Sequence, residues 1–291
     1  GSAFHVAMNG ASAGRKIISL LNVPDPVWGK NEVKGTELKL NGVTFSYDGK
    51  RDVLKNVFMT FPEKGMTAIV GESGCGKSTV VNMLVGAYRP KAGNVTVGGE
   101  VLENVTRESY YSHLASVSYN TYIFNDTVRA NFELAKKNAT DEEIWAALEA
   151  VNLADFIKEN GGLDKVITED ANNVSGGQKQ RLALAVNLVA DKDIYVFDEA
   201  TSNIDIESEA IIMDNIKAMS REKNVIVISH RLANVVPADN IYYMEEGEVK
   251  ESGSHAQLMS AQGGYAKLFN TQKALEEGYK EVTGATAEVS V

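Results

Sequence analysis

The stretch Gly71-Glu-Ser-Gly-Cys-Gly-Lys-Ser-Thr79 constrains this chain more than any other part of its sequence. It follows the apolar run Thr67-Ala-Ile-Val70, which predicts a buried strand, and it precedes residues 80–85, which predict the first turns of a helix. In this context the pattern G-x-x-x-x-G-K-[ST] has a physical basis. Its glycines let backbone N–H groups turn inward around an anion, and the helix N-terminus adds partial positive charge. The stretch therefore predicts a nucleoside-triphosphate site, and the context disfavours the alternative of an ordinary glycine turn.

The side chains of this loop predict how a triphosphate is held. Lys77 is expected to reach the β- and γ-phosphates, and the Ser78 hydroxyl is expected to ligate Mg²⁺. Cys75 is the only cysteine, which excludes a disulfide within this chain and suits a reducing compartment. A functional thiol at Cys75 is conceivable, but a small residue that fits the loop is the favoured interpretation. The candidate phosphate contacts are Gly71, Glu72, Ser73, Gly74, Cys75, Gly76, Lys77, Ser78 and Thr79.

The composition argues against several classes of protein. The chain is 44% hydrophobic and 23% charged, which is typical of a soluble globular protein long enough to bury a core. Its formal net charge of −10 argues against nucleic acid as a partner, because a non-specific nucleic-acid surface needs a basic stripe. No run of about 18 apolar residues is present, so no segment of this sequence is expected to span a bilayer.

The first half of the chain predicts a connecting helix and then a small sheet. Residues 3–22 carry apolar side chains near helical spacing, and we expect this helix to continue from a segment upstream. Pro24 and Pro26 would end it. From residue 37 the pattern alternates, with turns expected at Asn41-Gly42 and around Gly98-Gly99. We expect a largely antiparallel sheet around the phosphate-binding strand.

The second half predicts helices that alternate with buried strands, which indicates an α/β fold with a mainly parallel sheet. Thr140-Asp-Glu-Glu143 is typical of a helix start, with acids in the first turn. Helices are expected at 130–137, 141–151, 154–160, 176–189 and, as one amphipathic helix, 255–270. Strands are expected at 194–197 and 225–229, with a hairpin at 241–249. Residues 281–291 lack a pattern and are expected to be mobile.

Two carboxylates, Asp198 and Glu199, follow the buried strand expected at 194–197. Ligands of open α/β sheets bind at the carboxyl ends of the strands. Asp198 is therefore a candidate Mg²⁺ ligand, and Glu199 is a candidate general base for an attacking water. Paired acids at this place could instead cap the next helix, but the neighbouring phosphate loop favours the catalytic interpretation.

A serine and two glycines open the helix expected at 176–189. In Val174-Ser-Gly-Gly-Gln178, Ser175 is typical of a helix N-cap, and alone this segment predicts nothing more than a cap and a turn. Together with the other motifs, it resembles the signature of the nucleotide-binding domain of an ABC transporter. The resemblance covers residues 37–270 and includes Walker A at 71–79, Walker B at 194–199, the D-loop at 202–205 and a switch histidine, His230. Residues 124–131 and 1–30 look like the exporter type.

The resemblance implies a P-loop NTPase fold, with a mainly parallel sheet core, an antiparallel β subdomain and a helical subdomain at about residues 126–190. Residues 1–35 would connect from a transmembrane domain of the same polypeptide, 36–270 would form the nucleotide-binding domain, and 271–291 would form a C-terminal tail. The domain would hydrolyse ATP at the cytoplasmic face of the cell membrane and drive the export of a substrate that these residues do not identify.

The resemblance also implies a head-to-tail homo- or heterodimer that holds ATP and Mg²⁺ between Walker A of one subunit and the signature of the other. This is physically consistent, because a second helix N-terminus would add N–H donors and exclude water. Tyr47 would stack on adenine, and His230 would contact the γ-phosphate and position Glu199 with its water. The contacts from the second subunit would come from Ser175, Gly176, Gly177 and Gln178.

One position departs from the family pattern. Tyr119 falls where the family has a glutamine that touches Mg²⁺, and a neutral phenol is a poor ligand for a hard cation. A second interpretation therefore stays open, a binding-only regulatory half of a heterodimer with weak hydrolysis. A soluble ABC ATPase of DNA repair or translation is a third, and the acidic charge and the helix expected at 3–22 argue against it.

Overall fold

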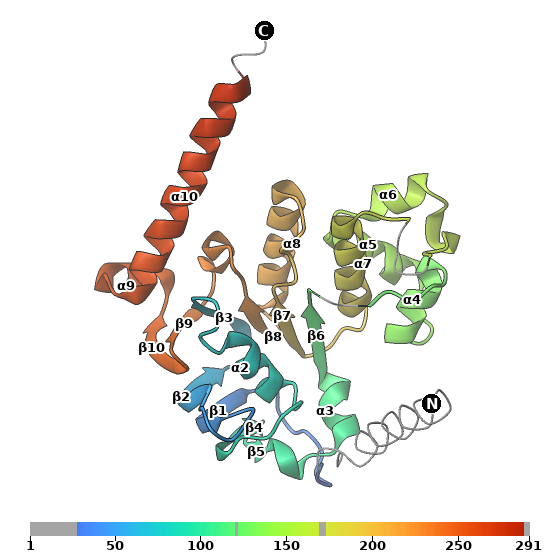
Figure 1. Ribbon diagram of the computed structural model, residues 1–291. Helices are drawn as coiled ribbons and strands as arrows, with labels where there is room; N and C mark the ends of the chain where they lie inside the picture. Colours follow the sequence, from blue (N-terminus) through green and yellow to red (C-terminus); the bar gives the residue numbers. More distant parts are fainter. Residues whose placement is uncertain (1–27, 120–121, 169–172, 288–291) are drawn as a thin grey trace, which may run out of the picture.

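The computed structural model describes residues 28–119, 122–168 and 173–287, with side chains described as far as Leu275. The helix expected at 3–22, most of the connection expected at 1–35 and residues 288–291 lie outside the described residues. Two sheets organise the chain, a six-stranded sheet of order β10-β9-β3-β8-β7-β6 and a four-stranded sheet of order β2-β1-β4-β5 (Figure 1). None of the helices that the structure describes is long and apolar enough to cross a membrane.

The six-stranded sheet confirms the expected α/β fold with a mainly parallel sheet. Five of its strands are parallel: β3 (Gly65–Gly71), β6 (Leu114–Ser118), β7 (Ile194–Asp198), β8 (Asn224–Ile228) and β9 (Asn240–Glu245). The sixth, β10 (Glu248–Gly253), pairs antiparallel with β9 and forms the expected hairpin. Because β3, β7 and β8 are parallel neighbours, the segments that follow them meet at one edge of the sheet.

The four-stranded sheet is antiparallel, as expected, but one of its predicted turns is wrong. Its strands are β1 (Leu38–Phe45), β2 (Leu54–Phe61), β4 (Ala92–Val97) and β5 (Glu100–Val101). Asn41-Gly42 does not break β1; it forms a bulge, with Gly42 at φ +63° and a register shift between Leu40 and Val43. Because β1 pairs with β2 on one side and β4 on the other, the two ladders carry it through the glycine. The phosphate-loop strand β3 belongs to the parallel sheet instead.

Apolar cores lie on both faces of the six-stranded sheet, and alternate residues of one strand contribute to each. In β8, Val225 and Val227 pack into the core beneath the helices, whereas Ile226 and Ile228 pack into the core that the antiparallel sheet covers. On one face of the sheet pack α7 (Gly176–Leu188) and α8 (Ile206–Met219), and on the other packs α2 (Lys77–Leu84). The short helix α3 (Arg107–His113) leads into β6 at its amino end. Beside α7 in Figure 1 lie α4 (Val128–Ala135), α5 (Asp141–Ala150) and α6 (Ala154–Glu159). The predicted start of α5 is confirmed by a capping box between Thr140 and Glu143.

The C-terminal region differs from the prediction in two ways. The single helix expected at 255–270 is two, α9 (His255–Ala261) and α10 (Gly264–Ala287). At the break, Gln262 takes a left-handed conformation at φ +53° and ends α9. A Cβ at Gly264 would lie 2.4 Å from the Tyr243 ring, so the next helix starts where only glycine fits. The mobile stretch expected at 281–291 is helical as far as Ala287, and Figure 1 shows α10 extending away from the sheets.

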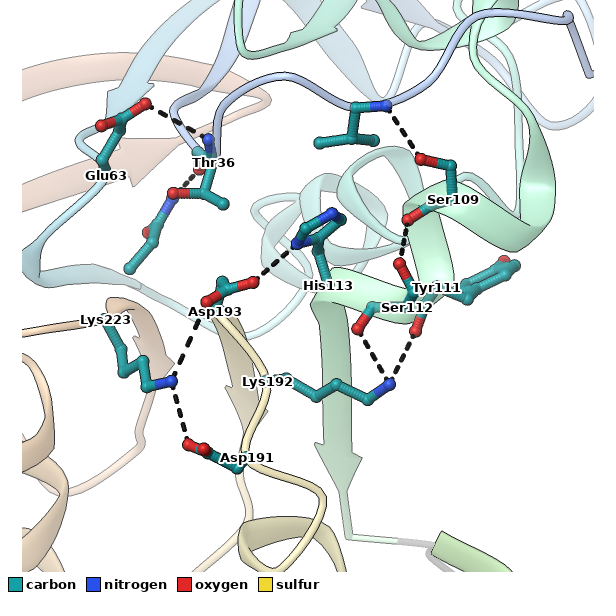
Figure 2. Close-up of polar contacts among 12 residues, drawn as sticks. Thr36, Glu63, Ser109, Tyr111, Ser112, His113, Asp191, Lys192, Asp193 and Lys223 are labelled. Atoms are coloured by element: carbon teal, nitrogen blue, oxygen red, sulfur yellow. Dashed lines mark hydrogen bonds and ion pairs between the residues drawn. The ribbon is translucent and has the colours of Figure 1, made fainter. Parts of the chain in front are cut away.

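The amino ends of the parallel strands are closed by polar contacts, which Figure 2 shows. His113 Nδ1 lies 2.6 Å from Asp193 Oδ2, which joins the end of α3 to the start of β7. Lys223 Nζ, just before β8, lies 2.9 Å from Asp191 and 3.8 Å from Asp193. Lys192 Nζ donates to two carbonyls of the last turn of α3, where a cation also complements the helix dipole. Ion pairs and hydrogen bonds therefore hold three strand starts together.

Candidate nucleotide site

The phosphate loop connects β3 to α2 at the opposite, carboxyl end of the sheet. It needs glycine at Gly71 because a Cβ there would lie 2.2 Å from the Met244 carbonyl oxygen. Gly74 and Gly76 take φ values of +81° and +112°, which residues other than glycine rarely adopt. Gly76 is the N-cap of α2, so the backbone turns directly into the helix N-terminus. These conformations are those that the glycine pattern predicts for an anion-binding loop.

Lys77 is buried at the base of this loop, with 6% of its surface exposed. Its Nζ donates hydrogen bonds to the carbonyl oxygens of Gly71, at 2.8 Å, and Glu72, at 2.9 Å. Carbonyl dipoles orient the ammonium group without neutralising its charge. The lysine therefore holds a positive charge in a fixed place, as binding of an anionic phosphate requires.

A hollow of about 250 Å³ lies over the loop. It brings the loop together with two of the predicted catalytic side chains, which arrive from other elements of the sheet. Its lining consists of Val53, Ser73, Gly74, Gly76, Lys77, Ser78, Thr79, Glu199 and His230. Residues from three strand ends thus share one solvent-open cavity.

Asp198, the last residue of β7, carries a carboxylate oxygen that is buried and accepts no hydrogen bond within the described residues. Burial raises the pKa of Asp198 above its usual value, the neighbouring Glu199 carboxylate raises it further, and Lys77 and His230 oppose this shift. A buried oxygen without a partner is costly unless something binds it, and a Mg²⁺ ion would do so. The described residues contain no group of three or more His, Cys, Asp or Glu side chains able to hold a metal alone. The donor set fits an ion that the phosphates of a nucleotide also ligate.

Glu199 follows Asp198 in a conformation that favours glycine. Its φ is +55°, and its N–H donates to the Ile228 carbonyl oxygen at 2.9 Å, which ties it to the end of β8. Non-glycine residues at positive φ are uncommon and store strain of about 1–3 kcal/mol, often at functional sites. His230 Nε2 lies 2.5 Å from Glu199 Oε1, and the His230 side chain is 56% exposed. A carboxylate held by an imidazole at the edge of a phosphate cavity is suited to accept a proton from water.

The signature segment lies elsewhere in the chain. Ser175 is the N-cap of α7 and forms a capping box with Gln178, in which Gln178 N–H donates to Ser175 Oγ at 3.2 Å and Ser175 N–H donates to Gln178 Oε1 at 2.8 Å. This confirms the predicted helix start. Ser175 and Gly176 are exposed, and neither they nor Gly177 and Gln178 line the phosphate-loop hollow. Within one chain, the structure does not bring the signature segment and the loop together.

Tyr47 and Tyr119 take up different positions. The Tyr47 hydroxyl lies 3.1 Å from Thr79 Oγ1, so the ring stands beside the start of α2 with 54% of its surface exposed. Tyr119, at the end of β6, lines a second hollow of about 290 Å³ with Tyr122 and the first turns of α7. The structure therefore does not place the Tyr119 phenol in the lining of the hollow that Ser78 shares.

Sequence reasoning missed two buried polar residues that connect these segments. Gln180 of α7 donates through Nε2 to the Glu199 carbonyl oxygen at 3.2 Å and accepts from Asn203 N–H at 3.1 Å. Glu209 of α8 accepts a hydrogen bond from Thr201 at 2.7 Å and pairs with Arg231. The available signal was their position, because both occupy helix faces where the 3.6-residue period predicts apolar residues.

Comparisons with known proteins agree with this geometry. The sequence model of the family described as ABC transporter matches residues 54–202. An uncharacterized ABC transporter ATP-binding protein of Haemophilus influenzae is 42% identical, over 98% of this chain and 51% of its own length. An ATP-dependent lipid A-core flippase of Aliivibrio fischeri is 39% identical over 84% of this chain and 42% of its length. The chain thus spans about half the length, or less, of these curated relatives.

Among solved structures, a bacterial Atm1-family ABC exporter with ATP bound has a TM-score of 0.83. It is 30% identical in sequence, and the match covers 93% of this chain and 49% of the exporter chain. The fold class predicted from the sequence, a P-loop NTPase with an antiparallel β subdomain and a helical subdomain, is confirmed by this likeness.

Proposed function

The chain belongs to the ABC transporter family, and from this premise we propose that it is the ATP-binding and ATP-hydrolysing domain of an exporter. The observation that carries the proposal is the Glu199–His230 pair, which faces the phosphate-loop hollow that Lys77 also lines. A site that only bound nucleotide would need the loop but not a carboxylate and imidazole beside it. The flippase and exporter among the similar proteins support transport as the purpose of hydrolysis.

Each group of the hollow has a part in this proposal. The loop amides and Lys77 bind and orient the phosphates, since phosphoryl transfer depends mainly on positioning and charge stabilisation. Ser78 and the buried oxygen of Asp198 would hold Mg²⁺, and that ion supplies charge neutralisation at the phosphates. Glu199 accepts the proton of an attacking water, and His230 holds the Glu199 carboxylate in place.

The exposed signature segment supports dimerisation as the source of motion. Ser175 caps α7 at the surface, so the N–H groups of Gly176 and Gly177 remain available to an anion from outside the chain. We propose that a second nucleotide-binding domain places its phosphate loop against this helix end, head to tail. ATP would close such a dimer and hydrolysis would open it. A transmembrane domain of the same polypeptide would convert that motion into export from the cytoplasmic face of the membrane.

A Glu199→Gln substitution tests this function. The amide keeps the size of the side chain but cannot take a proton, so we expect ATP turnover to fall by roughly 10²–10⁴-fold. ATP affinity should change little, and size-exclusion chromatography with ATP and Mg²⁺ should show the variant as a longer-lived dimer. Glu207→Gln, an acid in the first turn of α8, is the matched control and should turn over ATP at the wild-type rate. A Glu199→Gln variant as active as the wild type would refute Glu199 as the general base, and an inert wild type would refute the proposed hydrolysis.

A second candidate function is a binding-only regulatory half of a heterodimer. It is favoured by one observation, that Tyr119 lines the hollow beside α7 and not the one over the phosphate loop. Calorimetry with ATP separates the two functions. ATP binding without turnover, in both the wild type and Glu199→Gln, would support the regulatory function.

A further inference from the structure

The C-terminal helix contacts the segment that carries His230. From α10, the Gln272 side chain donates through Nε2 to the His230 carbonyl oxygen at 2.8 Å, and its Oε1 accepts from Leu232 N–H at 2.9 Å. One amide thus bridges the backbone on both sides of Arg231. The bridge joins residues 40 and 42 positions apart in the sequence. The side chain thus supplies hydrogen bonds to the backbone of this segment, as a neighbouring strand would in a sheet.

Other contacts hold the backbone of the far part of this segment but not that of His230. The nearly buried Glu209 carboxylate pairs with the Arg231 guanidinium and accepts from Asn234 Nδ2 at 2.8 Å. Ser229 Oγ, on the near side, accepts from Arg231 N–H at 3.1 Å. The contacts with Glu209 anchor Arg231 and Asn234 to α8, whereas within the described residues the His230 carbonyl accepts its hydrogen bond from Gln272.

Packing does not fix His230 either. Its side chain is 56% exposed, and a hollow of about 280 Å³ opens where the segment, the phosphate loop and α10 meet. That hollow is lined by Gly71, Ser73, His230, Leu232, Leu268 and Gln272, among others. Because a hollow supplies few dispersion contacts, the backbone position of His230 depends on its hydrogen bonds.

We propose that Gln272 is a positioning residue for His230, through which the C-terminal helix α10 sets the rate of ATP turnover. Gln272 fixes the His230 carbonyl and the Leu232 N–H, and this holds the imidazole where Nε2 meets the Glu199 carboxylate. The inference rests on the proposed hydrolytic function. It also gives a role in the site to the first residues of the segment 271–291, for which the sequence predicted only a tail.

The first experiment measures the bridge without relying on activity. In Gln272→Met the side chain keeps its length and apolar stem but loses both polar atoms. NMR-detected hydrogen exchange on the whole 291-residue chain should then show the Leu232 amide exchanging about tenfold faster, as expected for one lost hydrogen bond. Thr271→Ala is the matched control, because among the described residues Thr271 Oγ1 bonds to the Lys267 carbonyl within its own helix, α10. Leu232 exchange unchanged by Gln272→Met would overturn the proposal.

The second experiment measures turnover. Gln272→Met should lower kcat about tenfold, with KM for ATP and the binding of ATP within twofold of the wild type, because the side chain lies outside the phosphate-loop lining. Thr271→Ala should leave both parameters unchanged. A Gln272→Met variant with wild-type kcat would overturn the positioning role while leaving the proposed function intact. An inert wild type would refute the proposed function instead, and the Leu232 exchange would still decide whether the bridge exists.

Discussion

The two ends of the parallel sheet are built in opposite ways. At the amino ends, His113, Asp193, Lys223 and Asp191 form contacts between complementary groups, and Lys192 caps α3 (Figure 2). At the carboxyl ends, Asp198 has a buried oxygen with no partner among the described residues, Glu199 takes a left-handed conformation, and Lys77 is buried against carbonyls. The charged side chains of the amino end therefore pair within the chain, although Asn224 Oδ1 at the start of β8 is buried there without a partner among the described residues. At the carboxyl end it is a carboxylate oxygen, that of Asp198, that is left to be satisfied by a ligand.

This difference shows that the carboxyl end is less stable in the free protein than it could be, because its groups are arranged for binding a ligand. Unsatisfied buried groups and left-handed non-glycine residues each cost free energy in the free protein. They persist where a ligand relieves the cost, which is the physical reason that local rules fail at functional sites. Substitutions of the same kind at the two ends should consequently have different effects, on ligand binding at one end and on stability at the other.

The largest effect is expected for Lys77→Ala at the carboxyl end. Hydrogen bonds to charged groups contribute about 1.5–3 kcal/mol each, so loss of the ammonium should weaken ATP binding by about 100-fold. Isothermal titration calorimetry with ATP and Mg²⁺ measures this. Lys192→Ala removes the same charge from the amino end, where the ammonium bonds to the Tyr111 and Ser112 carbonyls, and should leave ATP affinity unchanged. Equal losses of affinity in both variants would contradict the division between the ends.

The motifs of the carboxyl end could be predicted from sequence because each is local. The phosphate loop, Asp198 and Glu199 are defined by neighbours within a few residues, so their pattern is complete in the sequence itself. Gln180 and Gln272 were missed because the partners of Gln180 lie 19 and 23 positions away and those of Gln272 lie 40 and 42 away, and their neighbours in the sequence do not indicate which residues they pair with.

Errors in the predicted fold have the same origin. Asn41-Gly42 is compatible with a turn or a bulge, and the ladders of β1 with β2 and β4 decide between them. The break between α9 and α10 depends on Gly264, which lies against the distant Tyr243 ring. In each case a tertiary contact overrides a local signal that the sequence leaves ambiguous.

A smaller effect is expected for Asp193→Asn at the amino end. This carboxylate lies 2.6 Å from His113 Nδ1 and 3.8 Å from Lys223 Nζ, and its side chain is 48% exposed. Partly exposed ion pairs contribute about 0.2–1 kcal/mol, so the free energy of unfolding should fall by roughly 0.5 kcal/mol. Urea denaturation of the nucleotide-free protein measures this loss. ATP affinity, measured in parallel, should stay at the wild-type value. A change in ATP affinity with no loss of stability would mean that the amino end contributes to binding and not to stability, contrary to the comparison.

An asparagine at position 198 should raise the stability of the free protein, where an asparagine at position 193 lowers it. This is the smallest effect expected of the three substitutions. Burial raises the pKa of Asp198 above its ordinary value, so the folded protein binds this proton more tightly than the unfolded chain does. A group of this kind favours folding below its unfolded pKa and loses that contribution as the pH rises through its folded pKa. Asp198→Asn, which cannot ionise, should therefore unfold at a higher temperature than the wild type in the absence of metal and nucleotide. The difference in melting temperature should be larger at pH 7 than at pH 4.

Thermal melts of both variants measure this. At pH 7, Asp193→Asn should melt below the wild type and Asp198→Asn above it. A lowered melting temperature for Asp198→Asn would mean that its carboxylate is satisfied in the free protein.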